Sequence, residues 1–101
     1  MKLSTFSIRK ALINNQIVLT KIAQVKMQKR GYSKNDLIKC IWTGEITNIH
    51  VHAGKLRGVM EGLDAHNNPI VCVIGEDENN SDLFKVFNLF PQIKENYKRV
   101  I

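Results

Sequence analysis

The run IVCVI, residues 70–74, decides the fold of this chain, because it is the most strand-like segment in the sequence. Four of its five residues are β-branched and none is polar. This composition is typical of a strand that lies at the centre of a sheet. A turn-forming segment over residues 64–69 precedes the run, and an acidic polar loop over residues 76–82 follows it. We therefore expect a central strand here.

Alternating apolar and polar residues predict further strands on both sides of this run. The expected strands cover residues 45–51, 56–63 and 83–90. A turn over residues 52–55 joins the first two, and Pro91 ends the last. On the last strand, Phe84, Val86, Phe87 and Leu89 are expected in the core. The tail from residue 92 is expected to add one helical turn or a frayed end.

The first half of the chain instead predicts helices, each with a polar residue before it. The expected helices are residues 4–14, residues 21–30, and a third that follows a capping box formed by Ser33 and Asp36. Gly31 supplies the left-handed residue that ends many helices, and Gly44 is expected to end the third helix as Gly31 ends the second. Residues 16–19 are apolar but too few to classify. The two later helices are expected to pack as a pair.

This order of elements predicts an α+β fold in a single domain, residues 1–101. Two to three N-terminal helices pack on one face of a curved antiparallel sheet of about four strands. The other face of the sheet must either bind something or be polar.

Positive charge is concentrated in the first half of the chain. The net charge is +6, but nine Lys and Arg against a single Asp give residues 1–44 a charge of +8. Six cations against eight anions give residues 45–101 a charge of −2. Such a sided field steers a polyanion onto one face, and nucleic acid is the commonest such partner of a basic domain. A basic surface tuned for solubility, or one that docks an acidic protein, is the alternative.

The cysteines and the termini indicate a cytoplasmic protein without a cofactor. Cys40 and Cys72 have apolar neighbours and no metal-ligand spacing, so we expect buried, reduced thiols. No apolar run approaches the roughly 18 residues of a membrane span, and the N-terminus lacks the pattern of a secretion signal. No metal, cofactor or membrane partner is expected.

Two motifs resemble a known family. TxIAxxKMxxRGYS over residues 20–33, followed by DLIxxIxxGEI over residues 36–46, is similar to the signature of the small bacterial domain-of-unknown-function 4258 family. Weaker similarities follow at residues 62–70, at Phe90-Pro91 and at Lys98-Arg99, so the match covers about residues 16–99. The resemblance implies the fold of the RelE and MqsR messenger-RNA-cleaving toxins. It also implies an RNA-directed ribonuclease of a toxin–antitoxin system, or a degenerate relative of one, with an antitoxin as a protein partner. In that picture RNA lies on the free face of the sheet and on the helix edge.

One departure from the family pattern bears directly on activity. The family carries a helix histidine where this chain has Ile22, although Lys26 and Arg30 continue the cationic line at i+4 and i+8. RNA cleavage without a metal needs groups that accept and return protons, and a positive group that stabilises the phosphorane. Ile22 supplies none of these.

A second group of residues offers a substitute. His50 and His52 are two residues apart, so on a strand their side chains share one face. Lys55 and Arg57 are also two apart, on the next predicted strand, and can face the histidines across the turn. If the chain is a metal-independent endoribonuclease, we expect His50, His52 and Arg57 to be its catalytic residues. The alternatives are a turn position for His52, a surface role for His50, and a weak metal pair that lacks a third ligand. His66, in the turn before Pro69, is expected to be exposed.

The expected nucleic-acid contacts are Lys26, Lys29, Arg30, Lys55 and Arg57, because each exposed cation adds salt-sensitive attraction for phosphate. Tyr32 and Trp42 either stack on bases or close a small core. The alternative to an enzyme is a non-catalytic basic module that binds nucleic acid or an acidic protein.

Overall fold

The elements follow the predicted order, with one strand more than expected. A computed structural model describes residues 3–80 and 82–92. Its elements are α1 (Thr5–Ile13), β1 (Ile17–Leu19), α2 (Lys21–Arg30), α3 (Lys34–Thr43), β2 (Glu45–His52), β3 (Lys55–Leu63), β4 (Pro69–Glu76) and β5 (Phe84–Pro91). The predictions for the tail, including the similarity at Lys98 and Arg99, fall on residues 93–101 and lie outside the described residues.

The sheet is mixed and five-stranded, in the order β1-β5-β4-β3-β2. The run at residues 70–74 lies in β4, which is the middle strand as predicted. The strands from β2 to β5 form an antiparallel meander, but β1 pairs with β5 in parallel. The prediction of an antiparallel sheet of about four strands therefore missed β1. Three residues are too short to show a period, and only their pairing with β5 identifies them as a strand.

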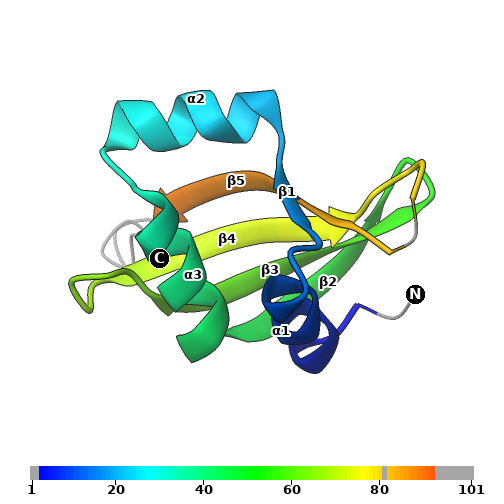
Figure 1. Cartoon of the computed structure of the whole chain (residues 1–101), viewed down its shortest axis with the longest axis horizontal. Helices are drawn as coiled ribbons and strands as arrows, with labels where there is room; N and C mark the ends of the chain where they lie inside the picture. The colour runs from blue at the N-terminus through cyan, green and yellow to red at the C-terminus, as the bar shows by residue number, and fades with distance from the viewer. Residues whose placement is uncertain (1–2, 81, 93–101) are drawn as a thin grey trace, which may run out of the picture.

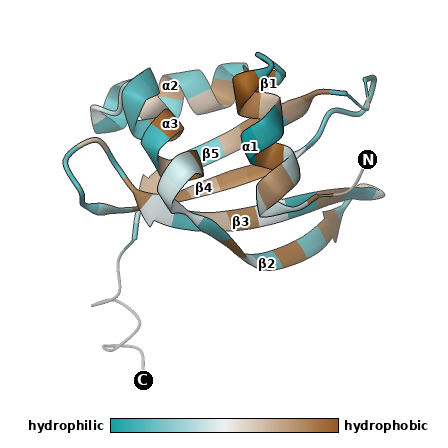
Figure 2. Ribbon diagram, turned by 60° about the horizontal axis from the view of Figure 1, so that its bottom comes forward, coloured by the Kyte–Doolittle hydropathy of each residue, from teal (hydrophilic) through white to brown (hydrophobic). Residues whose placement is uncertain are grey.

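The three described helices all lie on one side of the sheet, and none of them covers the other side (Figures 1 and 2). Helix α2 packs along β5, whereas α3 packs on β3 and against α1. The expected packing of the two later helices as a pair is therefore wrong, since each rests mainly on the sheet. The core between the layers is apolar, and its largest fully buried side chains include Phe84, Ile8, Ile41, Met60, Ile70 and Ile74. The fold is α+β, as the order of elements predicted.

The helix caps confirm most of the sequence signals. The hydroxyl of Ser4 accepts the N–H of Ser7, and the hydroxyl of Thr20 accepts the N–H of Ala23. Gly31 has a φ of 76° and ends α2 in the left-handed conformation. Gly44 does follow α3, but its φ of −91° is not left-handed. Glycine is therefore required at this position for another reason.

That reason is close packing of backbone on backbone. A Cβ at Gly44 would lie 2.5 Å from the carbonyl oxygen of Cys40 and 2.8 Å from that of Glu61. A Cβ at Gly62 would lie 2.5 Å from the same Cys40 oxygen and 2.9 Å from the Cα of Gly44. The two glycines therefore let the C-terminal end of α3 rest directly on β3.

A β-bulge in β5 changes which residues of its second half face the core. Val73 pairs with Asn88 and Ile74 pairs with Val86, so Phe87 is the additional residue on β5. Phe84, Val86 and Leu89 are fully buried in the core, as expected. Phe87 is only half-buried and contacts Arg57. The prediction that Phe87 lies in the core was therefore wrong, because alternation from Phe84 and Val86 directs Phe87 to the other face, and the bulge brings Leu89 rather than Phe87 into the core.

Both cysteines are buried and unpaired, as the sequence predicted. Burial raises the pKa of the Cys40 thiol to about 12, and burial together with the nearby Cys40 raises the pKa of Cys72 well above its ordinary value. Of the helices that the structure describes, none has the length and apolar character needed to cross a membrane.

Candidate nucleic-acid interface

The hairpin of β2 and β3 brings the predicted cluster together. His50 lies directly opposite Arg57, and His52 lies directly opposite Lys55. His52 is the last residue of β2, so it belongs to the strand rather than to the turn. The turn itself is formed by Ala53 and Gly54, both with positive φ. Because directly opposed residues project to the same side of a sheet, all four side chains share one face.

That face is the helix-free side of the sheet. Along β4 the residues that face the helices are Ile70, Cys72 and Ile74, so Gly75 between Ile74 and Glu76 faces the other way. Gly75 pairs with Arg57, and a Cβ there would lie 3.0 Å from the Cγ of Arg57 and 3.2 Å from the Phe87 ring. The glycine thus leaves room for Arg57 to cross β4 toward Phe87.

The guanidinium of Arg57 is held in place by stacking. Its Cζ lies 3.7 Å from the centroid of the Phe87 ring, a cation–π contact that typically contributes about 0.5–1 kcal/mol at partly exposed sites. Arg57 is half-buried, whereas His50, His52 and Lys55 are exposed. The stacked guanidinium therefore has a fixed position on an otherwise open surface, and its outer face remains able to meet a planar group or a phosphate.

A shallow cleft of about 220 Å³ lies beside this stack. It is lined by His52, Ala53, Lys55, Arg57, Glu76, Glu78 and Phe87. The two glutamates were not part of the predicted site, because Glu76 ends β4, Glu78 lies in the acidic loop after it, and no local signal links this segment to the hairpin. The cleft is thus basic on its β2–β3 side and acidic on its β4–β5 side.

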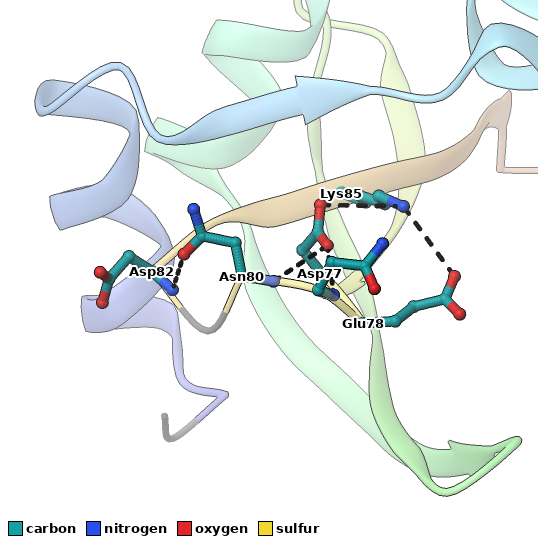
Figure 3. Close-up of polar contacts among 6 residues, drawn as sticks. Asp77, Glu78, Asn80, Asp82 and Lys85 are labelled. Atoms are coloured by element: carbon teal, nitrogen blue, oxygen red, sulfur yellow. Dashed lines mark hydrogen bonds and ion pairs between the residues drawn. The ribbon is translucent and has the colours of Figure 1, made fainter.

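The acidic loop is ordered by its own side chains and neutralises one lysine (Figure 3). The carboxylate of Asp77 accepts the N–H groups of Asn79 at 2.7 Å and of Asn80 at 3.2 Å. The Nζ of Lys85 lies 3.7 Å from Asp77 and 3.9 Å from Glu78. The N–H of Asn79 is the main cause that lowers the pKa of Asp77, and Lys85 adds to it. Lys85 is therefore committed to this loop.

The cations of α2 differ from one another in exposure and in their contacts. Arg30 donates from Nη1 to the side-chain oxygen of Asn88 at 2.9 Å and to the carbonyl oxygen of Leu89 at 2.8 Å. These bonds tie the end of α2 to β5, beyond the part of β5 that β1 covers. Arg30 thus has a structural role at the sheet edge. Lys29 is exposed and Lys26 is half-buried. Ile22, which stands where the family carries histidine, is 65% exposed.

The two candidate stacking residues lie away from the helix-free face. Tyr32 is half-buried and packs against the core, and Asp64 and Asp36 are close enough that, after burial, their charges raise its pKa. Trp42 is 47% exposed and lines a hollow on the helix side. Of the two predicted alternatives, closing the core fits Tyr32, whereas Trp42 is not among the residues of the core.

One cluster of potential ligands was missed in the sequence. The side chains of Asp36, Asp64 and His66 have ligand atoms within 4.8 Å of one another. Both oxygens of Asp36 already accept backbone N–H groups, from Ser33 at 2.7 Å and from Ala65 at 2.8 Å. Asp64 likewise accepts the N–H groups of His66 and Asn68. Asp36 thus joins the start of α3 to the β3–β4 turn, whereas Asp64 holds that turn together from within. His66 is exposed as predicted.

Acid is expected to weaken this junction. Burial raises the pKa of Asp36, but the N–H groups of Ser33 and Ala65 and the Ser33 hydroxyl outweigh burial and lower the pKa below its ordinary value near 3.8. A lowered folded-state pKa means that the stabilisation is complete above the ordinary value and is lost as the pH falls through the folded value. Asp36→Asn should therefore lower the free energy of unfolding by about 1–3 kcal/mol at pH 7.

Urea unfolding at a series of pH values measures this effect. The difference between the original protein and Asp36→Asn should stay constant from pH 7 to about pH 5 and shrink below about pH 4. Asp82→Asn, which changes an exposed carboxylate, is the control for net charge. A difference that grows on acidification would contradict the expected direction.

Comparison of the chain with protein-family models, with curated proteins and with solved structures found no match. The resemblance to the domain-of-unknown-function 4258 family therefore stays a prediction.

Proposed function

We propose that this protein acts on single-stranded RNA through the helix-free face of its sheet, as a toxin-type protein similar to RelE and MqsR. In this proposal His50, His52 and Arg57 form a metal-independent ribonuclease site in the cytoplasm. The observation that carries the proposal is the pairing of His50 with Arg57 and of His52 with Lys55 on an open face.

The chemistry follows from the types of residue in the cluster. One histidine takes the proton from a ribose 2′-hydroxyl, whose oxygen attacks the adjacent phosphorus. The other histidine returns a proton to the departing 5′-oxygen, so the products are a 2′,3′-cyclic phosphate and a 5′-hydroxyl. Arg57 and Lys55 stabilise the charge that develops on the phosphorane. The fixed guanidinium suits this role better than the exposed lysine does.

Single-stranded RNA suits the surface better than a duplex. Unpaired bases can stack on planar groups, and the guanidinium of Arg57 on the Phe87 ring offers such a plane. The acidic loop with Glu76 and Glu78 repels phosphate on the other side of the cleft. The backbone of the RNA is therefore expected to follow the β2–β3 side.

The cations of α2 extend this surface only at its edge. Arg57 contacts Phe87, and Arg30 donates to the neighbouring Asn88. The two guanidinium groups therefore contact adjacent residues of β5. We assign Lys26 and Lys29 to outlying phosphate contacts, and Arg30 to a positioning role with a weaker electrostatic contribution. A toxin of this kind implies an antitoxin, whose gene would neighbour this one.

A cleavage assay tests the proposal. A short fluorophore- and quencher-labelled RNA, in buffer with EDTA, should be cut to a product that mass spectrometry identifies as a 2′,3′-cyclic phosphate. His50→Ala should lower the rate by at least about a hundredfold, since general acid–base catalysis typically contributes that much. It should leave RNA binding nearly unchanged. His66→Ala, which changes an exposed histidine in the β3–β4 turn, is the matched control.

Binding is measured separately by fluorescence anisotropy at several salt concentrations. Arg57→Ala should weaken binding and lower the slope of log K against log salt by about 0.7, the value for one phosphate contact on a single strand. Arg57→Lys should keep that slope but bind more weakly, because lysine lacks the planar group. If the affinity for RNA does not depend on salt, or if Arg57→Ala leaves it unchanged, the helix-free face is not the RNA-binding surface.

A second function is favoured by the residue at position 22. An exposed isoleucine stands where the resemblance implies a catalytic histidine. The same face would then bind RNA or an acidic protein without cutting anything. RNA binding that depends on Arg57, without a cyclic-phosphate product, would favour this function over the nuclease.

A further inference from the structure

An apolar groove lies on the opposite side of the molecule from the proposed RNA face. It measures about 560 Å³ and is formed by α1, β1, α2 and α3. Its lining is mostly apolar and includes Leu12, Ile13, Ile17, Leu19, Ile38 and Trp42. Several of these side chains are unusually open for large hydrophobic residues: Ile13 is 68% exposed and Trp42 is 47% exposed. Apolar surface of this kind marks a binding site more often than it marks a solvated face.

One wall of the groove is the edge of the sheet. The carbonyl oxygen of Gln16 accepts the N–H of Phe84, and the N–H of Thr20 donates to the carbonyl oxygen of Val86. Since successive residues of a strand direct their backbone groups to opposite sides, Ile17 and Leu19 direct theirs away from β5. Among the described residues, no strand follows β1 on that side.

At this edge, a side chain already donates a hydrogen bond to the backbone of β1, as a neighbouring strand would. The amide nitrogen of Gln24, on α2, donates to the carbonyl oxygen of Leu19 at 3.3 Å. Gln24 also lines the groove. This bond is long and exposed, so an extended backbone that offers its own N–H can replace it. The edge of β1 is therefore suited to accept one more strand.

The charges around the groove define what that strand must carry. Lys34 is the one charged side chain among the described residues that line it. The helices that form its walls also expose Lys10 and Lys21, and residues 3–35 contain no acidic residue. Asp36, the first acidic residue of the chain, is buried and accepts backbone hydrogen bonds. The surroundings are thus positive, and a partner with carboxylates is electrostatically matched.

From these observations we infer that the groove docks an extended segment of a partner protein in which apolar and acidic residues alternate. The segment adds a strand to β1, inserts its apolar side chains between Ile13 and Trp42, and directs its carboxylates toward the lysines. An RNA strand does not fit this site, because its phosphates gain nothing from apolar walls. The inference does not depend on RNA cleavage, since the groove and the His50–Arg57 face lie on opposite sides of the sheet.

A synthetic peptide tests the inference on the full chain. The probe is a fluorescein-labelled nonapeptide of alternating valine and glutamate, and the comparison peptide has lysine in place of glutamate. The glutamate peptide should bind, change the fluorescence of Trp42, and slow amide hydrogen exchange at Ile17 and Leu19. The lysine peptide should bind at least about tenfold more weakly.

Two matched variants locate the binding. Ile13→Glu and Ile22→Glu both place a carboxylate at an exposed isoleucine, 68% and 65% exposed, but only Ile13 lines the groove. Ile13→Glu should weaken binding of the glutamate peptide at least about tenfold, and Ile22→Glu should change it little. Lys34→Glu should also weaken it. His50→Ala should not affect it, whatever that variant does to RNA.

Four results would overturn the inference. They are no binding of the glutamate peptide, equal binding of the lysine peptide, equal effects of Ile13→Glu and Ile22→Glu, and displacement of the peptide by an unstructured oligouridylate. Analytical ultracentrifugation of the protein alone tests whether a second copy of this chain occupies the groove instead. A dimer that Ile13→Glu dissociates would mean that a second copy of this chain fills the groove.

Discussion

Replacing Gly62 with alanine is expected to lower the free energy of unfolding by about 2–4 kcal/mol, one of the two largest effects we predict for a single substitution. The added Cβ would lie 2.5 Å from the carbonyl oxygen of Cys40 and 2.9 Å from the Cα of Gly44. Both contacts are with backbone atoms, so no side chain can rotate away. Helix α3 would have to move off β3, and the buried contacts of Cys40 and Ile41 would loosen with it.

Gly58→Ala is the matched control on the same strand and the same face. There the nearest atom to the added Cβ is the Cδ2 of Leu3, a flexible side-chain end, at 3.1 Å. We expect a change below about 1 kcal/mol, measured by urea unfolding followed by circular dichroism. Equal losses in Gly58→Ala and Gly62→Ala would show that the close approach of α3 does not limit stability.

Phe84→Ala is expected to lower the free energy of unfolding by about 3–5 kcal/mol, because it removes a large side chain that is fully buried. Phe84 lies where β5 meets β1, opposite Ile17. The cavity would therefore open at the point where the shortest strand joins the sheet. Loss of β1 from the sheet should accompany the loss of stability and should appear as faster hydrogen exchange at Thr20, whose N–H donates to Val86.

Phe87→Ala is the comparison for the opposite face of the same strand. Phe87 is three residues further along β5 and lies half-buried on the helix-free face under Arg57. Its removal should cost only about 1–2 kcal/mol, from lost apolar contact and the cation–π pair. It should affect RNA binding more than stability. Similar losses of stability in Phe84→Ala and Phe87→Ala would contradict the placement of Phe84 in the core and of Phe87 on the helix-free face.

The candidate site could be predicted in part. The spacing of His50 and His52, and of Lys55 and Arg57, around a short glycine-containing turn was enough to expect that they face one another. The partners that shape the site could not be found in this way. Phe87, Gly75 and Glu76 reach it from strands that follow later in the chain, and only the register of β3, β4 and β5 brings them beside Arg57.

The charge pattern of the sequence shows where cations are concentrated in the chain, but not which of them are held by contacts within the fold. Arg30 belongs to a dense basic segment, yet its hydrogen bonds go to Asn88 and Leu89, more than fifty positions away. Lys85 is held by Asp77 and Glu78 across a loop. A sequence shows how many cations a chain has, whereas the fold decides which of them remain available to a ligand.

The sequence by itself determined the class of fold and the approximate ends of most of its elements, because these depend on residues close together in the chain. The apolar run at 70–74, the Ser4 and Thr20 caps, and the left-handed Gly31 are local signals of this kind. The tertiary structure alone decided the parallel pairing of β1, the bulge that brings Leu89 into the core, and the contact of Gly44 with Gly62. Each of these depends on the register between distant segments, which is fixed by packing of the whole core and leaves no periodic trace in the sequence.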